Sequence, residues 1–236
     1  MICVGAGQIG MAIARRMGAG LKIILGDKSI ENARNIASIM NNAGFDVTAM
    51  EMDLSSRESI RHLIVEAQKY GKISMLVNAA GVSPSQASIE TILKVDLYGT
   101  AVLLATADVN ELLSLDMLQP DNIKDSLHAY QLAKRCNVKR VMSEAIKWGE
   151  HKARINSISP GIIVTPLAID EFNGPRGDFY KNMFAKSPAG RPGTADEVAN
   201  VAELLMSDKG TFITGADFLI DGGATAFYFY GPLLSN

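Results

Sequence analysis

The stretch VGAGQIG, residues 4–10, decides the fold because it places three glycines where a strand gives way to a helix. Gly5, Gly7 and Gly10 follow the apolar run ICV and open the segment QIGMAIARRMGAG, whose apolar residues recur at helical spacing. Such glycines allow a tight turn and let backbone N–H groups approach a pyrophosphate, which the amino terminus of the helix also attracts. The pattern predicts dinucleotide binding, with a flexible turn as the alternative.

Strand-like and helix-like segments continue to alternate after this loop. Strands are expected at LKIIL (21–25), FDVTAMEM (45–52) and KISMLVN (72–78), and helices at 29–44 and 55–71, the latter opening as Ser-x-x-Glu from Ser55. The last strand is nearly all apolar, as expected for a strand buried on both faces. The alternation predicts an α/β fold with a Rossmann-type, doubly wound parallel sheet in three layers, formed by residues 1–236 as one domain.

The composition of the chain restricts the kinds of molecule that it is expected to bind. The net charge of −2 gives no electrostatic reason to expect nucleic acid or an anionic membrane surface. No apolar run approaches the ~18 residues of a membrane span, and the first residues do not resemble a secretory signal. Cys3 and Cys136 lack metal-ligand spacing and the three histidines are scattered, so no metal site is expected. We expect a cytoplasmic protein with reduced cysteines that acts on a small molecule.

Acidic residues at two strand ends bear on the choice of dinucleotide. Asp27 ends the second strand, where a carboxylate accepts hydrogen bonds from the adenosine ribose and repels a 2′-phosphate, which favours NAD. Lys28 follows directly and could receive a phosphate, so NADP stays possible. Asp53 and Leu54 follow the third strand, where they could reach the adenine. The alternative for each charge is a solvated loop residue.

The segment DSLHAYQLAKRC, residues 125–136, places Tyr130 four residues before Lys134. Residues four apart share one face of a helix, so both side chains can point at one site. A tyrosine phenol is normally protonated at neutral pH, and a neighbouring ammonium favours the phenolate that a proton-transfer step needs. The spacing alone does not separate a catalytic pair from two surface residues.

Four further motifs resemble those of the short-chain dehydrogenase/reductase family. They are NAAG (78–81), RINSISPGIIVTP (154–166), AGRPGTADEVANVAELLMSD (189–208) and ITGADFLIDGG (213–223). The resemblance runs over almost the whole chain and places Tyr130 and Lys134 at the family's active-site Tyr-x-x-x-Lys. It implies an NAD(P)-dependent enzyme that transfers a hydride between a nicotinamide cofactor and an alcohol or ketone.

The resemblance also implies residue roles. Tyr130 would exchange a proton with the substrate oxygen, while Lys134 would hold the nicotinamide ribose. The Ile163 backbone and the Thr165 hydroxyl would bind the carboxamide, in a turn shaped by Pro160 and Gly161. The full set of implied cofactor contacts is Gly5, Gln8, Ile9, Gly10, Asp27, Lys28, Asp53, Leu54, Asn78, Ala79, Gly81, Tyr130, Lys134, Pro160, Gly161, Ile163 and Thr165.

Two local departures from the family pattern concern single positions. The glycine loop is about one residue shorter than the family's T-G-x-x-x-G-x-G. Asp96, in KVDLYGT, stands where the family has an asparagine that helps to hold a water for proton relay. We include Asp96 with Tyr130 and Lys134 in the predicted catalytic set.

The largest departure follows GTAVLLATA, residues 99–107, where the family's fifth strand and its serine have no counterpart. Loss of that strand would leave a gap of roughly 9–10 Å with unpaired backbone on both sides. We therefore expect that residues are missing between about Ala105 and Asp108. The alternative is that TAVLLATA (100–107) forms the strand, with Thr106 near the serine's place. Ser114 and Ser126 are candidates for the family's serine by residue type only.

The remaining expectations concern organisation and alternatives. Residues 108–125 resemble an insertion found in some bacterial hydroxysteroid and carbonyl reductases of the family, and residues 167–190 fall at its substrate lid. The family resemblance implies a homotetramer or homodimer. Two other functions stay open: a catalytically inactive dinucleotide-binding sensor or scaffold, and an isomerase or epimerase with tightly bound NAD.

Overall fold

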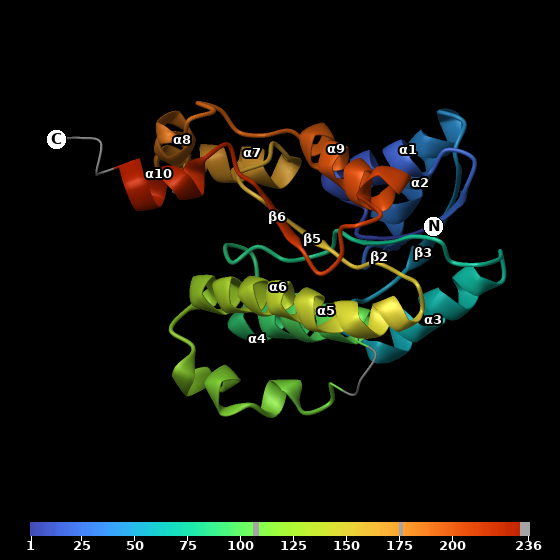
Figure 1. The fold of residues 1–236 in the computed structure, drawn as a ribbon. Helices are drawn as coiled ribbons and strands as arrows, with labels where there is room; N and C mark the ends of the chain where they lie inside the picture. Colours follow the sequence, from blue (N-terminus) through green and yellow to red (C-terminus); the bar gives the residue numbers. More distant parts are fainter. Residues whose placement is uncertain (106–108, 175–176, 232–236) are drawn as a thin grey trace.

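A computed structural model describes residues 1–105, 109–174 and 177–231. Its amino-terminal half is a four-stranded parallel sheet in the order β3-β2-β1-β4 (Figure 1). The strands are β1 (Ile2–Val4), β2 (Lys22–Asp27), β3 (Asp46–Glu51) and β4 (Leu76–Asn78), and the intervening helices are α1 (Gln8–Met17), α2 (Ile30–Asn42) and α3 (Arg57–Gln68). The predicted strand-helix alternation is confirmed here, although β4 covers only the end of the apolar stretch KISMLVN.

The second half contains one long helix of 25 residues, α6, with several shorter helices and two more strands. It consists of α4 (Ile89–Ile92), a π-helix (Leu93–Gly99), α5 (Thr100–Leu104), α6 (Ser126–Glu150), β5 (Ser157–Pro160), α7 (Pro166–Asn173), α8 (Gly177–Lys186), α9 (Ala195–Met206), β6 (Asp217–Ile220) and α10 (Ala224–Tyr230), with single 3₁₀ turns at Leu112–Ser114, Asp116–Leu118, Pro120–Asn122 and Asp208–Gly210. The strands β5 and β6 pair in parallel with each other as a separate sheet.

Two apolar clusters place helices on both faces of the strands. Cys3 of β1 packs into the cluster that α1, α2 and α9 form on one face. Its neighbours Ile2 and Val4 pack with α3 and α5 on the other face. Successive side chains of a strand point to opposite faces, so this single strand joins both layers. The predicted three-layer, Rossmann-type α/β fold is confirmed.

Two sequence interpretations are corrected by the local structure. Thr100–Leu104 forms helix α5, so the interpretation of TAVLLATA as a fifth strand is wrong for these residues, while Thr106 lies outside the described residues. The amino-terminal cap of α3 is Ser56, whose hydroxyl accepts from the Ser59 N–H at 3.2 Å, and not the box expected from Ser55. The Ser55 hydroxyl instead donates to Asp53 Oδ1 at 2.6 Å, and the helix begins one residue later, at Arg57.

The predicted insertion and lid stay predictions. The described part of the insertion, 109–125, carries three single 3₁₀ turns, and residue 108 lies outside the described residues. The lid range 167–190 includes most of α7 and all of α8, apart from positions 175–176, which are not described. Among the helices of the described ranges, none is long and apolar enough to cross a bilayer.

Candidate active site

The glycine loop packs tightly against the segment that follows β4. Gly5 has φ of +94°, a left-handed conformation that favours glycine, and a Cβ on it would lie 2.6 Å from Ala80 N. A Cβ on Gly10 would overlap the carbonyl oxygen of Gly5. The loop conformation and its contact with the loop 78–81 therefore depend on these two glycines.

The amino terminus of α1 fits a pyrophosphate. Gly7 is the helix cap, no side chain caps the helix, and the first turn carries no acidic residue. The space beside Gly7 is open to 4 Å, so an oxygen ligand could approach the backbone there. The first N–H groups of a helix attract anions. Gln8, Ile9 and Gly10 stand at this helix start, and their contact with a diphosphate stays a prediction.

Asp27 shapes the same loop from the end of β2. Its Oδ2 accepts from the Ala6 N–H at 2.8 Å and its Oδ1 accepts from the Ser29 N–H at 2.9 Å. The carboxylate thus holds the glycine loop against the start of α2 while its remaining lone pairs can accept ribose hydroxyls. The predicted cofactor residue is also a structural residue of the loop.

Lys28 is engaged with a carboxylate in this structure. Its Nζ lies 3.2 Å from Asp53 Oδ2. Asp53 also accepts from the Ser55 N–H and hydroxyl, at 2.8 and 2.6 Å. Burial acts to raise the pKa of Asp53, but the hydrogen bonds from Ser55 and the contact with Lys28 outweigh it and lower that pKa below its ordinary value. Lys28 is therefore paired with an anionic carboxylate.

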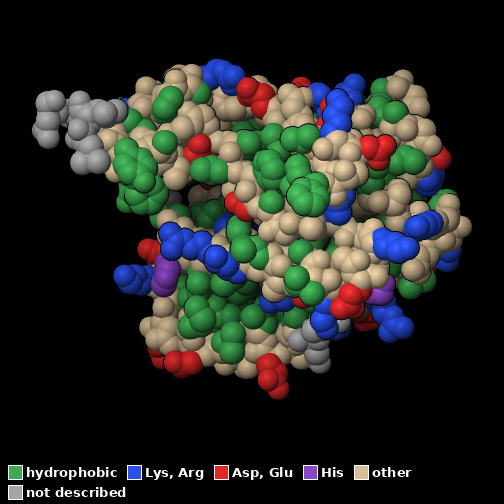
Figure 2. All heavy atoms as spheres, viewed as in Figure 1, with side chains coloured by type: hydrophobic (Ala, Val, Ile, Leu, Met, Phe, Trp, Pro, Cys, Tyr) green, Lys and Arg blue, Asp and Glu red, His purple; other side chains and the backbone are tan. Residues whose placement is uncertain are grey.

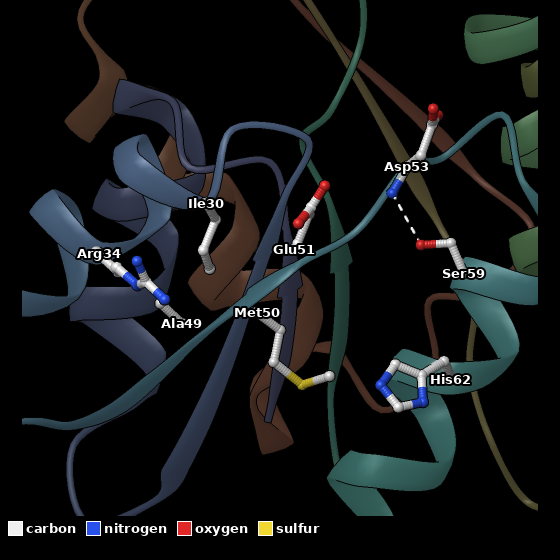
Figure 3. A pocket seen from close by; sticks show the side chains of 8 residues that line it. All are labelled: Ile30, Arg34, Ala49, Met50, Glu51, Asp53, Ser59 and His62. Atoms are coloured by element: carbon white, nitrogen blue, oxygen red, sulfur yellow. Dashed lines mark hydrogen bonds between the residues drawn. The ribbon is translucent and has the colours of Figure 1, made fainter.

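An open groove of about 510 Å³ lies beside Asp53, between α2, β3 and α3 (Figure 3). Its lining is Ile30, Arg34, Ala49, Met50, Glu51, Asp53, Ser59 and His62. The Asp53 N–H donates to Ser59 Oγ at 2.9 Å, as the dashed line shows, while the carboxylate points away from His62. The groove touches only the Asp53 end of the predicted site and contains neither Tyr130 nor Lys134. Leu54 is buried in the apolar cluster that includes α3 and α5.

The predicted catalytic residues come together around a buried carboxylate. Asp96 lies in the π-helix and is 0% exposed; its Oδ1 accepts from the Val82 N–H at 2.9 Å. Its Oδ2 lies 3.0 Å from Lys134 Nζ. The same Nζ lies 5.0 Å from the centre of the Tyr130 ring. π-Helical turns frequently occur at functional sites, and this one directs Asp96 at the lysine of the pair.

The loop after β4 lines this cluster. A Cβ on Gly81 would lie 3.2 Å from Lys134 Nζ, so the glycine leaves room at the ammonium. Asn78 donates from Nδ2 to Thr100 Oγ1 at 3.2 Å and accepts from the Ala80 N–H at 3.4 Å, which holds the loop against α5. Ala79 donates its N–H to Val4 O at 2.8 Å. Figure 2 shows the surface hollowed between the amino-terminal half of α6 and the helices α7 and α8.

The end of β5 supplies the third part of the site. Gly161 donates its N–H to Ile220 O at 3.1 Å, and a Cβ on it would lie 2.7 Å from Asp221 Cα. Ile163 is buried and pairs with Gly193 in an isolated bridge. Thr165 Oγ1 accepts from the Ala168 N–H at 3.1 Å as the cap of α7, which leaves the hydroxyl proton as a donor. The turn after Pro160 is therefore held in place by β6 and α7.

Ser114 and Ser126 both hydrogen-bond to backbone carbonyls. Ser114 Oγ donates to Glu111 O at 2.7 Å, and Ser126 Oγ donates to Pro84 O at 2.8 Å. Both hydroxyls have a structural role, and the two residues match the family's serine only in residue type.

Sequence reasoning missed a contact between the cleft loop and the lid range. Ser83 Oγ and Ser85 Oγ donate to Glu171 Oε1 of α7 at 2.8 and 2.6 Å. The three residues join the loop after NAAG to the first helix of the range 167–190. No local sequence pattern predicts this contact, because the partners are separated by 86 and 88 positions.

Comparison with known proteins agrees with the fold and the motifs. Residues 5–225 match the family described as enoyl-(acyl carrier protein) reductase. The chain is 32% identical, over 263 aligned positions covering 96% of each chain, to short-chain dehydrogenase/reductase bsc3 of Alternaria brassicicola. It is 29% identical to the NAD-dependent glycerol dehydrogenase of Listeria innocua, over 93% of this chain and 91% of the relative. The crystal structure of gox2181 has a TM-score of 0.79 at 24% identity and 95% coverage of both chains.

These matches define an oxidoreductase class built on a nicotinamide-binding Rossmann fold. The chain belongs to the short-chain dehydrogenase/reductase family. It is an oxidoreductase of the kind that interconverts alcohols and ketones with a nicotinamide cofactor. Neither the site nor the comparisons favour the inactive sensor or the isomerase.

Proposed function

We propose that the chain is an NAD-dependent dehydrogenase/reductase of a small alcohol or ketone, with Tyr130 as the general acid and base. The observation that carries this proposal is the cluster in which Lys134 Nζ lies 3.0 Å from Asp96 Oδ2 and 5.0 Å from the Tyr130 ring. When bound, the nicotinamide would supply or accept the hydride. The protein's own task is then to orient the substrate and to move one proton.

Each residue of the cluster has a distinct task in this proposal. The Tyr130 hydroxyl donates a proton to the carbonyl oxygen during reduction and takes it back during oxidation. Lys134 keeps a positive charge beside the phenol and offers donors to the nicotinamide ribose. Asp96, fully buried and hydrogen-bonded to the Val82 N–H, is a positioning residue that sets where the ammonium lies.

The choice of NAD over NADP rests on the adenosine end of the site. Asp27 places a carboxylate at the end of β2, and Lys28 is paired with Asp53 at 3.2 Å. Two carboxylates near the ribose repel a 2′-phosphate, and the Listeria innocua relative is named as NAD-dependent. Cys3 is buried and Cys136 is half-buried, both as free thiols, which suits the reducing cytoplasm.

A homotetramer or homodimer fits the exposed apolar surface. Tyr228, Phe229 and Tyr230 of α10 are more than half exposed and gather near the carboxyl-terminal end of the described chain (Figure 2). Contiguous aromatic surface is typical of protein interfaces. Light scattering after size exclusion would measure the state, and a monomer at micromolar concentration would contradict this part.

The proposal is tested by separating cofactor binding from turnover. We expect Tyr130→Phe to lower kcat about 10²- to 10⁴-fold, the usual contribution of a general acid or base. The dissociation constant of NADH, measured by fluorescence titration, should stay unchanged because the ring remains. Tyr98→Phe on the π-helix is the matched control. Undiminished turnover of a ketone panel by Tyr130→Phe would contradict the assignment.

A further inference from the structure

The face of α6 that carries Tyr130 and Lys134 also carries Asn137. The three residues stand at positions i, i+4 and i+7 of the helix, which share one face. The helix runs alongside α4, the π-helix and α5 (Figure 1). The proposed function uses the first two residues of this face and gives no role to the third.

Asn137 reaches from α6 to the π-helix. Its Nδ2 donates to the backbone carbonyl oxygen of Asp96 at 2.8 Å, a bond between residues 41 positions apart in the chain. Helix α6 therefore holds Asp96 at two points. Asn137 binds the backbone carbonyl, and Lys134 Nζ lies 3.0 Å from the carboxylate oxygen Oδ2.

The ion pair of Asp96 with Lys134 depends on where the backbone of Asp96 lies. Oδ1 is held by the Val82 N–H at 2.9 Å, and the residue is 0% exposed. Oδ2 meets the ammonium as an ion pair but makes no hydrogen bond with any residue that the structure describes. A buried charge is stabilised by a close partner, so a displaced Asp96 backbone would move the carboxylate and the ammonium together.

The π-helix needs neighbouring residues to hold it, because π-helical turns are rare and local in proteins. Leu97 of the π-helix and Ala133 of α6 belong to one buried apolar cluster. Apolar contact is not directional, so it brings the two helices together without fixing the orientation of the π-turn. A hydrogen bond is directional, and Asn137 supplies one at Asp96 itself.

The amide of Asn137 differs in its bonding from those of two other half-buried asparagines. Asn78 and Asn156 each donate through Nδ2 and accept through Oδ1. Asn137 donates, but its Oδ1 is buried and has no partner among the described residues. An unpaired buried acceptor costs free energy, and an apolar side chain of similar size would avoid that cost. The bond to Asp96, and not stability, therefore explains an asparagine at this position.

We propose that Asn137 is a positioning residue for the proton transfer at Tyr130. It anchors the Asp96 backbone to α6, and the carboxylate so placed keeps Lys134 Nζ 5.0 Å from the centre of the Tyr130 ring. In this proposal Asn137 touches neither substrate nor cofactor and acts only through Asp96. The inference rests on the proposed function, because it assigns a further residue to the same reaction.

Replacing Asn137 by leucine removes the donor and nearly keeps the volume. We expect Asn137→Leu to lower kcat about tenfold for the most rapidly reduced member of the ketone panel, since a misplacement of ~1 Å can cost up to ~10²-fold. KM for that ketone should change less than about twofold. The urea midpoint should not fall, because the unpaired acceptor is removed as well. Undiminished kcat would overturn the proposal.

Gln131→Leu is the matched control, since Gln131 is the exposed amide of the same helix. It should leave kcat unchanged, and an equal loss in both variants would overturn the proposal. Asn137→Gln keeps the amide donor on a longer side chain and should recover most of the lost kcat. If the leucine variant does not fold, Asn137→Ala lacks the same donor and takes its place, with the same loss expected.

A double-mutant cycle tests whether Asn137 acts through Asp96. In an Asp96→Ala background, Asn137→Leu should lower kcat less than about twofold further, because no carboxylate remains to be positioned. Equal losses in both backgrounds would overturn the proposal. The Tyr130→Phe variant keeps this test separate from the proposed function. Full activity of Tyr130→Phe defeats the function, whereas an inactive Tyr130→Phe beside a fully active Asn137→Leu defeats only the inference.

Discussion

Asp27 shows how one side chain can serve both the fold and the choice of cofactor. It accepts hydrogen bonds from the N–H groups of Ala6 and Ser29, which tie the glycine loop to the start of α2. Its negative charge faces the place where a 2′-phosphate would lie in the proposed binding mode. A substitution must therefore remove the negative charge of Asp27 without removing its hydrogen bonds to the loop. Asparagine comes nearest to this because it keeps one acceptor oxygen.

We expect Asp27→Asn to lower the ratio of kcat/KM for NAD to that for NADP by about tenfold, which corresponds to ~1.4 kcal/mol. The physical reason is the loss of repulsion toward the phosphate while the hydrogen bond to one loop amide remains. Steady-state kinetics with both cofactors measures the ratio. Lys28→Ala is the control and should change the ratio less, since Lys28 is exposed and paired with Asp53. An unchanged ratio in Asp27→Asn would contradict the assignment.

The residue scale also shows how far single positions could be predicted. The spacing of Tyr130 and Lys134 and the glycines of the loop were readable because they lie within one turn or one helix. The ion pair of Lys134 with Asp96 was not, because 38 positions separate the two residues and the π-helix that brings Asp96 inward has no sequence signature. The water-holding role expected for Asp96 remains a prediction beside this direct contact.

Among the elements, α7 is joined to the cleft loop by a small polar contact. Glu171 accepts from the hydroxyls of Ser83 and Ser85 at 2.8 and 2.6 Å. Hydrogen bonds to charged groups are worth ~1.5–3 kcal/mol, and less where water competes. The contact holds the first helix of the proposed lid over the loop that follows NAAG.

We expect Glu171→Ala to raise KM for the alcohol or ketone about three- to tenfold, because the lid helix loses its contact with the loop. The dissociation constant of NADH should not change, which a fluorescence titration would verify. Asp170→Ala removes an exposed carboxylate from the same helix and serves as the matched control. Identical KM values for the two variants would show that the contact does not hold a substrate lid.

Helix α9 begins with a complete capping box. Thr194 Oγ1 accepts from the Glu197 N–H at 3.3 Å, and Glu197 Oε2 accepts from the Thr194 N–H at 2.8 Å. Arg191 donates to both carboxylate oxygens of Glu197, at 2.9 and 2.7 Å. The hydrogen bonds from Arg191 and then from the Thr194 N–H lower the pKa of Glu197 to about 2.

A pH dependence of unfolding follows from this lowered pKa. Because the folded pKa lies below the ordinary 4.5, the stabilisation by Glu197 is complete above pH 4.5 and disappears as the pH falls toward about 2. Urea midpoints of wild type and Glu197→Gln should therefore differ at pH 7 and converge between pH 4.5 and 2. Glu203→Gln, later on the same helix, is the control. A difference that stays constant through that window would contradict the assignment.

At the scale of the whole molecule, a shared layer of helices joins the four-stranded sheet to the two-stranded sheet of β5 and β6. Val198 of α9 is 2% exposed and belongs to the cluster that contains Val77 of β4. Ile158 of β5 and Ile220 of β6 pack against the same cluster. Strands that do not pair with one another thus share one apolar core beneath α1 and α9. Cooperative unfolding of the two sheets should depend on this layer.

We expect Val198→Ala to lower the free energy of unfolding by about 2 kcal/mol, from lost burial and the cavity left behind. Urea transitions followed by far-UV circular dichroism and by Trp148 fluorescence should shift together, as in a two-state protein. Leu204→Ala, at a partly exposed position of the same helix, should cost less. If the fluorescence transition and the circular-dichroism transition had different urea midpoints, the two sheets would unfold independently.

The sequence by itself determined the β1–α1–β2 unit, the three-layer α/β class and the placement of Tyr130 and Lys134 one turn apart on a helix. These features rest on periodicity, glycine geometry and spacings of a few residues, all of which are local properties of a polypeptide. Only the tertiary structure decided that β5 and β6 form a separate sheet, that Lys134 lies against Asp96, and that Glu171 closes on the loop after β4. Such contacts join residues far apart in the chain, and they are set by how the layers pack.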